Sequence, residues 1–153
     1  MKKFVLILII IFVLVSLIFI MGKRNKNGFK KFATEGTISG ISYTIHDDYN
    51  QGNYDYSKRG YYVDTLNQPN APYYFIITMG EKNTGGYSIF ITDIKIDKEK
   101  NVEVIVKETE PKPGSIVTMA FTYPACCLEL NVPVNNIKII NTDGEIFNLI
   151  SDF

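Results

Sequence analysis

Three residue types that often carry chemistry are scarce in this sequence. Its 153 residues contain no Trp, one His and two Cys. The single His46 has no cysteine or carboxylate partners at a spacing typical of zinc sites. A Ser-His-Asp triad is equally unsupported, because the nucleophile turn Gly-x-Ser-x-Gly is absent. We therefore expect no catalytic residues, no metal and no cofactor, and interpret the protein as a non-enzyme.

The two cysteines, Cys126 and Cys127, are adjacent in an apparent strand. They form neither a C-x-x-C redox motif nor half of a metal site. A disulfide between neighbours needs unusual backbone geometry. Because successive side chains of a strand point to opposite faces, we expect one cysteine to face the core and the other to face outward. We interpret both as ordinary small packing residues.

Acidic residues are absent from the first 31 positions, which carry seven Lys or Arg. The rest of the chain has nine Lys or Arg against sixteen Asp or Glu, a balance of −7. The zero net charge is therefore the sum of a basic N-terminal region and an acidic domain. Since an acidic domain repels phosphate, we expect no nucleic-acid partner.

An apolar run of 18 residues extends from Phe4 to Met21, with Ser16 as its only polar member. As a helix it would span roughly 27 Å, close to the thickness of a bilayer's hydrocarbon core. The run is longer than the core of a cleaved signal peptide, and no Ala-x-Ala site follows it. We predict a transmembrane signal anchor at residues 1–21, a basic stalk at 22–35 and a β domain at 36–153.

The orientation of this predicted span is open to two interpretations. Five positive residues follow the span, which favours a cytoplasmic domain. Against that, a short N-terminal tail with Lys2 and Lys3 is typical of an exported chain. With the family resemblance described below, we favour a single-pass protein of the cell membrane whose domain is extracytoplasmic.

No segment of ten or more residues shows clean helical periodicity, whereas short alternating or apolar runs are frequent. An Asp-Gly turn at Asp143-Gly144 favours a hairpin near the C-terminus. The number and spacing of the runs predict an all-β domain, a small antiparallel sandwich or barrel-like fold. We predict strands at residues 36–45, 61–64, 73–79, 87–97, 102–108, 116–122, 125–130, 137–140 and 145–150.

Eight of the ten tyrosines lie between Tyr43 and Tyr74. Tyrosine offers a large contact area at low entropic cost, so this segment could bind a protein or glycan. The alternative is that the Tyr-rich loop folds against its own sheet. The composition does not decide between them.

A glycine-rich connection, Gly80–Tyr87, separates two strong predicted strands. Gly80 and Gly85 have the spacing of a phosphate loop, but Gly86-Tyr87 replaces the required Lys-Ser/Thr. We expect a tight connection in which Gly85 and Gly86 adopt positive φ. A loop of this kind between rigid strands is also typical of a partner contact.

Two motifs in order resemble the C-terminal domain of the PrcB family over residues 74–131. The first is Gly80-x-Lys82-x-Thr84-Gly85-Gly86-Tyr87, and the second is Glu110-Pro111-x-Pro113-Gly114 ahead of a run ending in Tyr123-Pro124. The family is named after a subunit of a bacterial surface protease complex. The resemblance implies an exported, non-enzymatic β domain that accompanies or stabilises a protease. The expected partner-contact residues are Lys82, Asn83, Thr84, Gly85, Gly86, Tyr87, Pro111, Pro113 and Gly114.

A second resemblance points to a different function. The chagasin type of cysteine-protease inhibitor carries Asn-Pro-Thr-Thr-Gly-Tyr in a loop, and Asn83–Tyr87 is similar but lacks the proline. The later Arg-Pro-Trp loop of those inhibitors is absent. The expected partners are therefore the bilayer, through one span, and a protein such as an exported protease, with protease inhibition as the alternative function.

Overall fold

The computed structural model describes residues 32–47, 53–65 and 72–150. The chain divides into two compact units, Met1–Lys30 and Lys31–Phe153, and the described residues belong to the second. The predicted span at residues 4–21 lies outside them. Within the described ranges no helix is long and apolar enough to cross a membrane. All nine elements of these ranges are strands, which confirms the all-β prediction.

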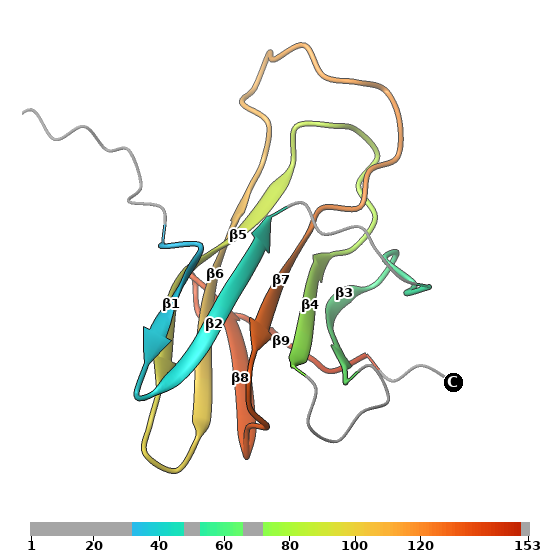
Figure 1. Cartoon of the computed structure of the whole chain (residues 1–153). Helices are drawn as coiled ribbons and strands as arrows, with labels where there is room; N and C mark the ends of the chain where they lie inside the picture. The colour runs from blue at the N-terminus through green and yellow to red at the C-terminus, as the bar shows by residue number, and fades with distance from the viewer. Residues whose placement is uncertain (1–31, 48–52, 66–71, 151–153) are drawn as a thin grey trace, which may run out of the picture. The chain divides into compact units, whose positions relative to one another are not determined.

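Five strands form the first sheet, in which every neighbouring pair is antiparallel (Figure 1). β7 lies at the centre of this sheet. The dense apolar run that forms β4 is explained by burial on both faces, because neither Ile76 nor Ile77 has any exposed surface. Across the sheet the order is β1 (Glu35–Ile38), β2 (Ile41–Asp47), β7 (Ala125–Leu130), β4 (Tyr73–Met79) and β3 (Arg59–Asp64).

Four strands form the second sheet, in the order β5 (Ser88–Ile96), β6 (Asn101–Thr109), β8 (Asn136–Asn141) and β9 (Ile146–Phe147). β5 and β6 make the predicted hairpin. β8 departs from the antiparallel prediction, because it pairs in parallel with β6. Between β6 and β8 the chain forms β7 in the first sheet. It then returns to the second sheet, at the end where β6 begins. Asn135 accordingly donates its backbone N–H to the carbonyl of Lys100 at 3.1 Å.

The main core lies between the two sheets. Side chains that alternate along β6 point into it, and Val102, Val104 and Val106 are at most 2% exposed. The sheets are also joined along one side, because Tyr61 of β3 exchanges backbone hydrogen bonds with Asn148 and Ile150 at 3.0 and 2.8 Å. The described part of the domain is thus a sandwich with a barrel-like closure on one side.

A second, smaller cluster covers the outer face of the first sheet. Cys127 packs there with Tyr62 and Ile76, whereas Cys126 belongs to the main core. Both cysteines are buried and neither forms a disulfide. Their places in two different clusters confirm their opposite orientation and their role in packing. Tyr54 and Tyr56 pack onto this cluster. The described part of the Tyr-rich segment therefore folds against its own sheet.

The predicted strand at residues 116–122 is wrong. This segment is part of an irregular loop between β6 and β7, in which only Thr122 makes an isolated bridge, to Lys82. The apolar pattern suits a strand, but the loop offers this segment no adjacent strand and no core face, and Ile116 and Met119 are 103% and 85% exposed. The predicted hairpin around Gly144 is present, with β9 reduced to two residues.

Candidate partner-contact site

Two loops lie side by side at one end of the sandwich, at the top of Figure 1. We call the β4–β5 loop (80–87) and the β6–β7 loop (110–124) the loop pair. The backbones of Lys82 and Thr122 exchange two hydrogen bonds of 2.9 Å, and Gly85 donates its N–H to the carbonyl of Thr118 at 2.9 Å. The hydroxyl of Thr122 donates to the carbonyl of Thr84 at 2.8 Å. These bonds hold two segments far apart in sequence as one surface.

Gly86 is the residue that allows the close approach of the two loops. Its φ is 88°, in the left-handed region that favours glycine. A Cβ added there would lie 2.9 Å from the Cβ of Pro111 and 3.1 Å from Cγ1 of Val117. The expectation of positive φ is therefore confirmed for Gly86. It is wrong for Gly85, whose φ is not positive and whose added Cβ would sit 3.4 Å from Thr118.

The structure brings all nine predicted contact residues to this end of the domain. Lys82 and Tyr87 are half-buried, and the ammonium of Lys82 lies 5.4 Å from the centroid of the Tyr87 ring, a distance compatible with a cation–π contact. Tyr87 also packs against the main core, so it supports the loop as well as lining it. Four of the nine are exposed to solvent: Asn83, Gly86, Pro113 and Gly114.

The most exposed part of the β6–β7 loop is not among the nine predicted contact residues. Ile116, Met119 and Phe121 are 103%, 85% and 62% exposed, although their types are normally buried. Their apolar pattern predicts a strand instead. One signal in the sequence could indicate this exposed apolar loop. The segment between Gly114 and the next proline, Pro124, contains no charged residue.

One family match covers the whole loop pair. Residues 73–131 match the PrcB C-terminal family model. The match confirms the PrcB resemblance over β4 to β7, the range in which the nine predicted contact residues lie. Neither the curated proteins nor the solved structures provide a significant match to the chain.

An ion network at the end of the sandwich that carries the loop pair connects the two sheets. The guanidinium of Arg59 donates to both carboxylate oxygens of Glu108, at 2.8 and 3.1 Å, and reaches Glu145 at 3.2 Å. It also lies 3.9 Å from the centroid of the Phe147 ring. Because Glu108 is next to the last residue of β6, this network fixes the point from which the β6–β7 loop departs.

The ionisation of Glu108 follows from this arrangement. Burial alone would raise the pKa of its carboxyl group. Hydrogen bonds from Arg59 and Asn141 outweigh that effect, helped by the positive charges of Arg59 and Lys82, and the net pKa is lowered. In the loop pair, the hydrogen bond from Tyr123 to Glu81, 2.8 Å long, raises the pKa of the Tyr123 phenol.

The outer face of the first sheet places a cysteine opposite the histidine. Cys127 and His46 are register partners on β7 and β2, and Nε2 of His46 lies 2.9 Å from a carboxylate oxygen of Glu129, within hydrogen-bond distance. Burial raises the pKa of Cys127 to about 12, with a further contribution from Glu129. The thiol therefore stays protonated and is a poor nucleophile. Among the described residues, no three His, Cys, Asp or Glu side chains could hold a metal ion.

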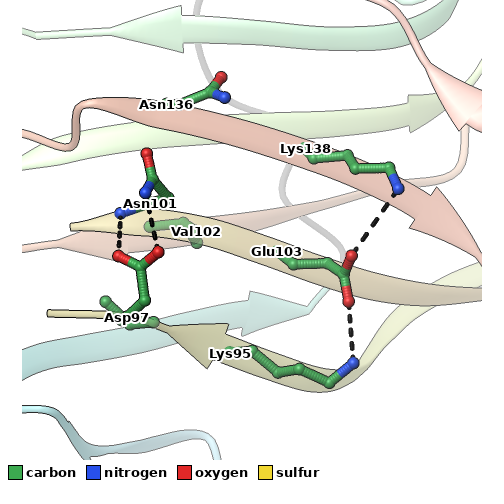
Figure 2. Close-up of a pocket in the computed structure, with 8 residues that line it drawn as sticks. Lys95, Asp97, Asn101, Val102, Glu103, Asn136 and Lys138 are labelled. Atoms are coloured by element: carbon green, nitrogen blue, oxygen red, sulfur yellow. Dashed lines mark hydrogen bonds and ion pairs between the residues drawn. The ribbon is translucent and has the colours of Figure 1, made fainter. Parts of the chain in front are cut away.

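A shallow pocket lies on the second sheet (Figure 2). Its charged side chains pair with one another, as Glu103 contacts Lys95 at 2.8 Å and Lys138 at 3.8 Å. Asp97 accepts hydrogen bonds from the backbone and side chain of Asn101, each 2.8 Å long. These are the cross-strand pairs expected on a solvated sheet face, so we do not place the partner-contact site there.

Proposed function

We propose that the protein is a membrane-anchored, extracytoplasmic, non-enzymatic module that binds a protein partner through the loop pair, and that the partner is an exported protease. One observation carries the proposal. The β4–β5 loop, which carries the motif Lys82–Tyr87, is hydrogen-bonded to the β6–β7 loop, which carries the motif Pro111–Gly114. Gly86 of the first motif also lies close to Pro111 of the second, so both motifs belong to one surface on a β scaffold. Loops held in this way are the usual place for partner recognition, because a rigid scaffold lowers the entropic cost of binding.

The partner class is supported by the family match. Both loops lie inside residues 73–131, the part that matches PrcB C-terminal. The family resemblance implies a domain that accompanies or stabilises a protease. The shape and contacts of the loops suit a binding role better than a catalytic one. The high pKa of Cys127 fits the non-enzymatic proposal.

The membrane anchor is supported by the sequence alone, and the extracytoplasmic location by the short N-terminal tail with Lys2 and Lys3 together with the family resemblance. The apolar run Phe4–Met21 is long enough to span a bilayer as a helix. When a protease is added to intact cells, we expect it to degrade the domain. A cytoplasmic protein, as the control, should stay intact. Protection of the domain until the cells are lysed would reverse the proposed orientation.

Site-specific photo-cross-linking tests the partner contact. A photoreactive amino acid at exposed Asn83 should form a cross-link to an exported protease in intact cells. The matched control is exposed Lys98, in the β5–β6 turn at the other end of the sandwich. Equal cross-linking from both positions, or none from Asn83, would contradict the proposal. A cross-linked protease whose activity is lost in proportion to the bound chain would favour the inhibitor alternative.

A further inference from the structure

The β6–β7 loop presents apolar side chains that nothing in the described domain covers. We call its segment 115–121 the apex. Ile116 and Met119 are 103% and 85% exposed, and Phe121 is 62% exposed. The apex contains no charged residue. Water contact at three large apolar side chains on one short loop is unfavourable, and such a patch is typical of a surface that meets a partner or a membrane.

The position of the chain's entry into the domain indicates which of these covers the apex. β1 is antiparallel to β2, with Glu35 opposite Thr44, so the chain approaches from the C-terminal end of β2. That end of β2 lies beside the start of β7, because Asp47 is opposite Cys126. The β6–β7 loop leads directly into β7. The chain therefore enters the domain at the end that carries the apex (Figure 1).

The length of the connection limits how far this end can lie from the bilayer. Ten residues, 22–31, separate the predicted span from the first described residue. Fully extended, they reach at most about 36 Å. With residues 4–21 in the membrane, the entry point stays within that distance of the bilayer surface. A weak lipid contact at the same end is then favoured by a high effective concentration.

The composition around the apex suits a lipid interface. Isoleucine, methionine and phenylalanine side chains enter the boundary between headgroups and acyl chains, while aromatic residues with a polar end, such as Tyr123, favour the headgroup level. Lys82 and Lys112 are balanced nearby by Glu81 and Glu110, so the contact would depend on apolar burial more than on attraction to anionic lipids.

We propose that the apex is a second membrane contact, in which Ile116, Met119 and Phe121 enter the interface of the bilayer that holds the anchor. This inference rests on the proposed function, because it needs the anchor. It adds the lipid interface as the occupant of the apex. The nine partner-contact residues lie outside the apex, so the proposal assigns them to the protein partner and only the apex to lipid.

The absence of tryptophan from the chain permits a direct test. The full-length chain with Phe121→Trp is reconstituted into phosphatidylcholine vesicles with and without brominated acyl chains. The emission of this single Trp should shift to shorter wavelength, and brominated lipid should lower its intensity at least about two-fold, because the ring lies at the acyl boundary. The matched control is Ile146→Trp in β9, where Ile146 is 57% exposed; its emission should not change.

Added charge and flotation make the outcomes distinct. Introducing Ile116→Asp and Met119→Asp into the Phe121→Trp chain should abolish the quenching. If the chain floats with the vesicles and brominated lipid quenches Phe121→Trp no more than Ile146→Trp, the second contact is overturned and the anchor stands. If the chain does not float, the anchor in the proposed function fails, and the second contact is overturned with it.

Discussion

At the scale of single residues, the shape of the loop pair depends most directly on Gly86. Its positive φ and its distance from Pro111 both exclude a side chain without local movement. Gly85, one position earlier, has neither constraint to the same degree. The two neighbouring glycines therefore offer a matched pair of substitutions in the same loop.

We predict that Gly86→Ala lowers the free energy of unfolding by about 2–4 kcal/mol, because it combines a left-handed backbone with a close contact to the other loop. Gly85→Ala should change it by no more than about 0.5 kcal/mol. Urea denaturation followed by tyrosine fluorescence measures both. Equal losses for the two variants would mean that the approach of the loops does not depend on Gly86.

A pH dependence is expected from Glu108. Its pKa in the folded state is lowered from the ordinary 4.5, so the stability that it contributes is present above that value and is lost as the pH falls through the lowered value. Urea midpoints between about pH 6 and about pH 3 should therefore fall more steeply for the parent chain than for Glu108→Gln. Parallel curves would show that Arg59 and Asn141 do not stabilise the ionised carboxylate.

Some residue-level features could be predicted from the sequence and others could not. The opposite faces of Cys126 and Cys127 follow from the alternation of a strand, and the structure confirms them. The ordinary backbone of Gly85 could not be predicted, because which of two adjacent glycines needs positive φ depends on the position of Pro111 in the other loop. Local pattern specifies orientation, whereas this choice depends on tertiary contact.

At the scale of elements, the same distinction explains the segment at residues 116–122. β5 and β6 were predictable because a polar turn joins two alternating runs that pair with each other. The segment at 116–122 has a similar composition but no adjacent strand. The parallel pairing of β8 with β6 could not be predicted from the sequence either, because it depends on which sheet the intervening β7 joins.

The apex should contribute little to the stability of the sandwich. We predict that Ile116→Ser with Met119→Ser changes the free energy of unfolding by about 1 kcal/mol or less, since both side chains are already in water. Ile91→Ala, at a core position 2% exposed, should cost about 2–5 kcal/mol. Thermal unfolding compares the two variants. A large loss for the apex variant would mean that the apex packs against the domain.

At the scale of the whole molecule, charge and hydropathy divide the chain into two parts. The absence of acidic residues from the first 31 positions and the excess of them afterwards separate a predicted basic anchor region from an acidic β domain. The all-β fold class of the domain followed from the number and spacing of its short alternating and apolar runs. The candidate site was predictable as two motifs, but their assembly into one surface is a property of the folded chain, because it depends on the bonds between Lys82 and Thr122.

The central claim is that the loop pair binds an exported protease, and the most direct measurement is the amount of protease recovered with the detergent-solubilised full-length chain. Recovery with Lys98→Ala, a substitution in the exposed β5–β6 turn at the other end of the sandwich, should equal that of the parent chain. With Gly86→Ala, whose loops are forced apart at Pro111, recovery should fall about ten-fold, provided that the variant is compared at equal folded protein. Equal recovery with all three chains, or no protease with any of them, would contradict the account.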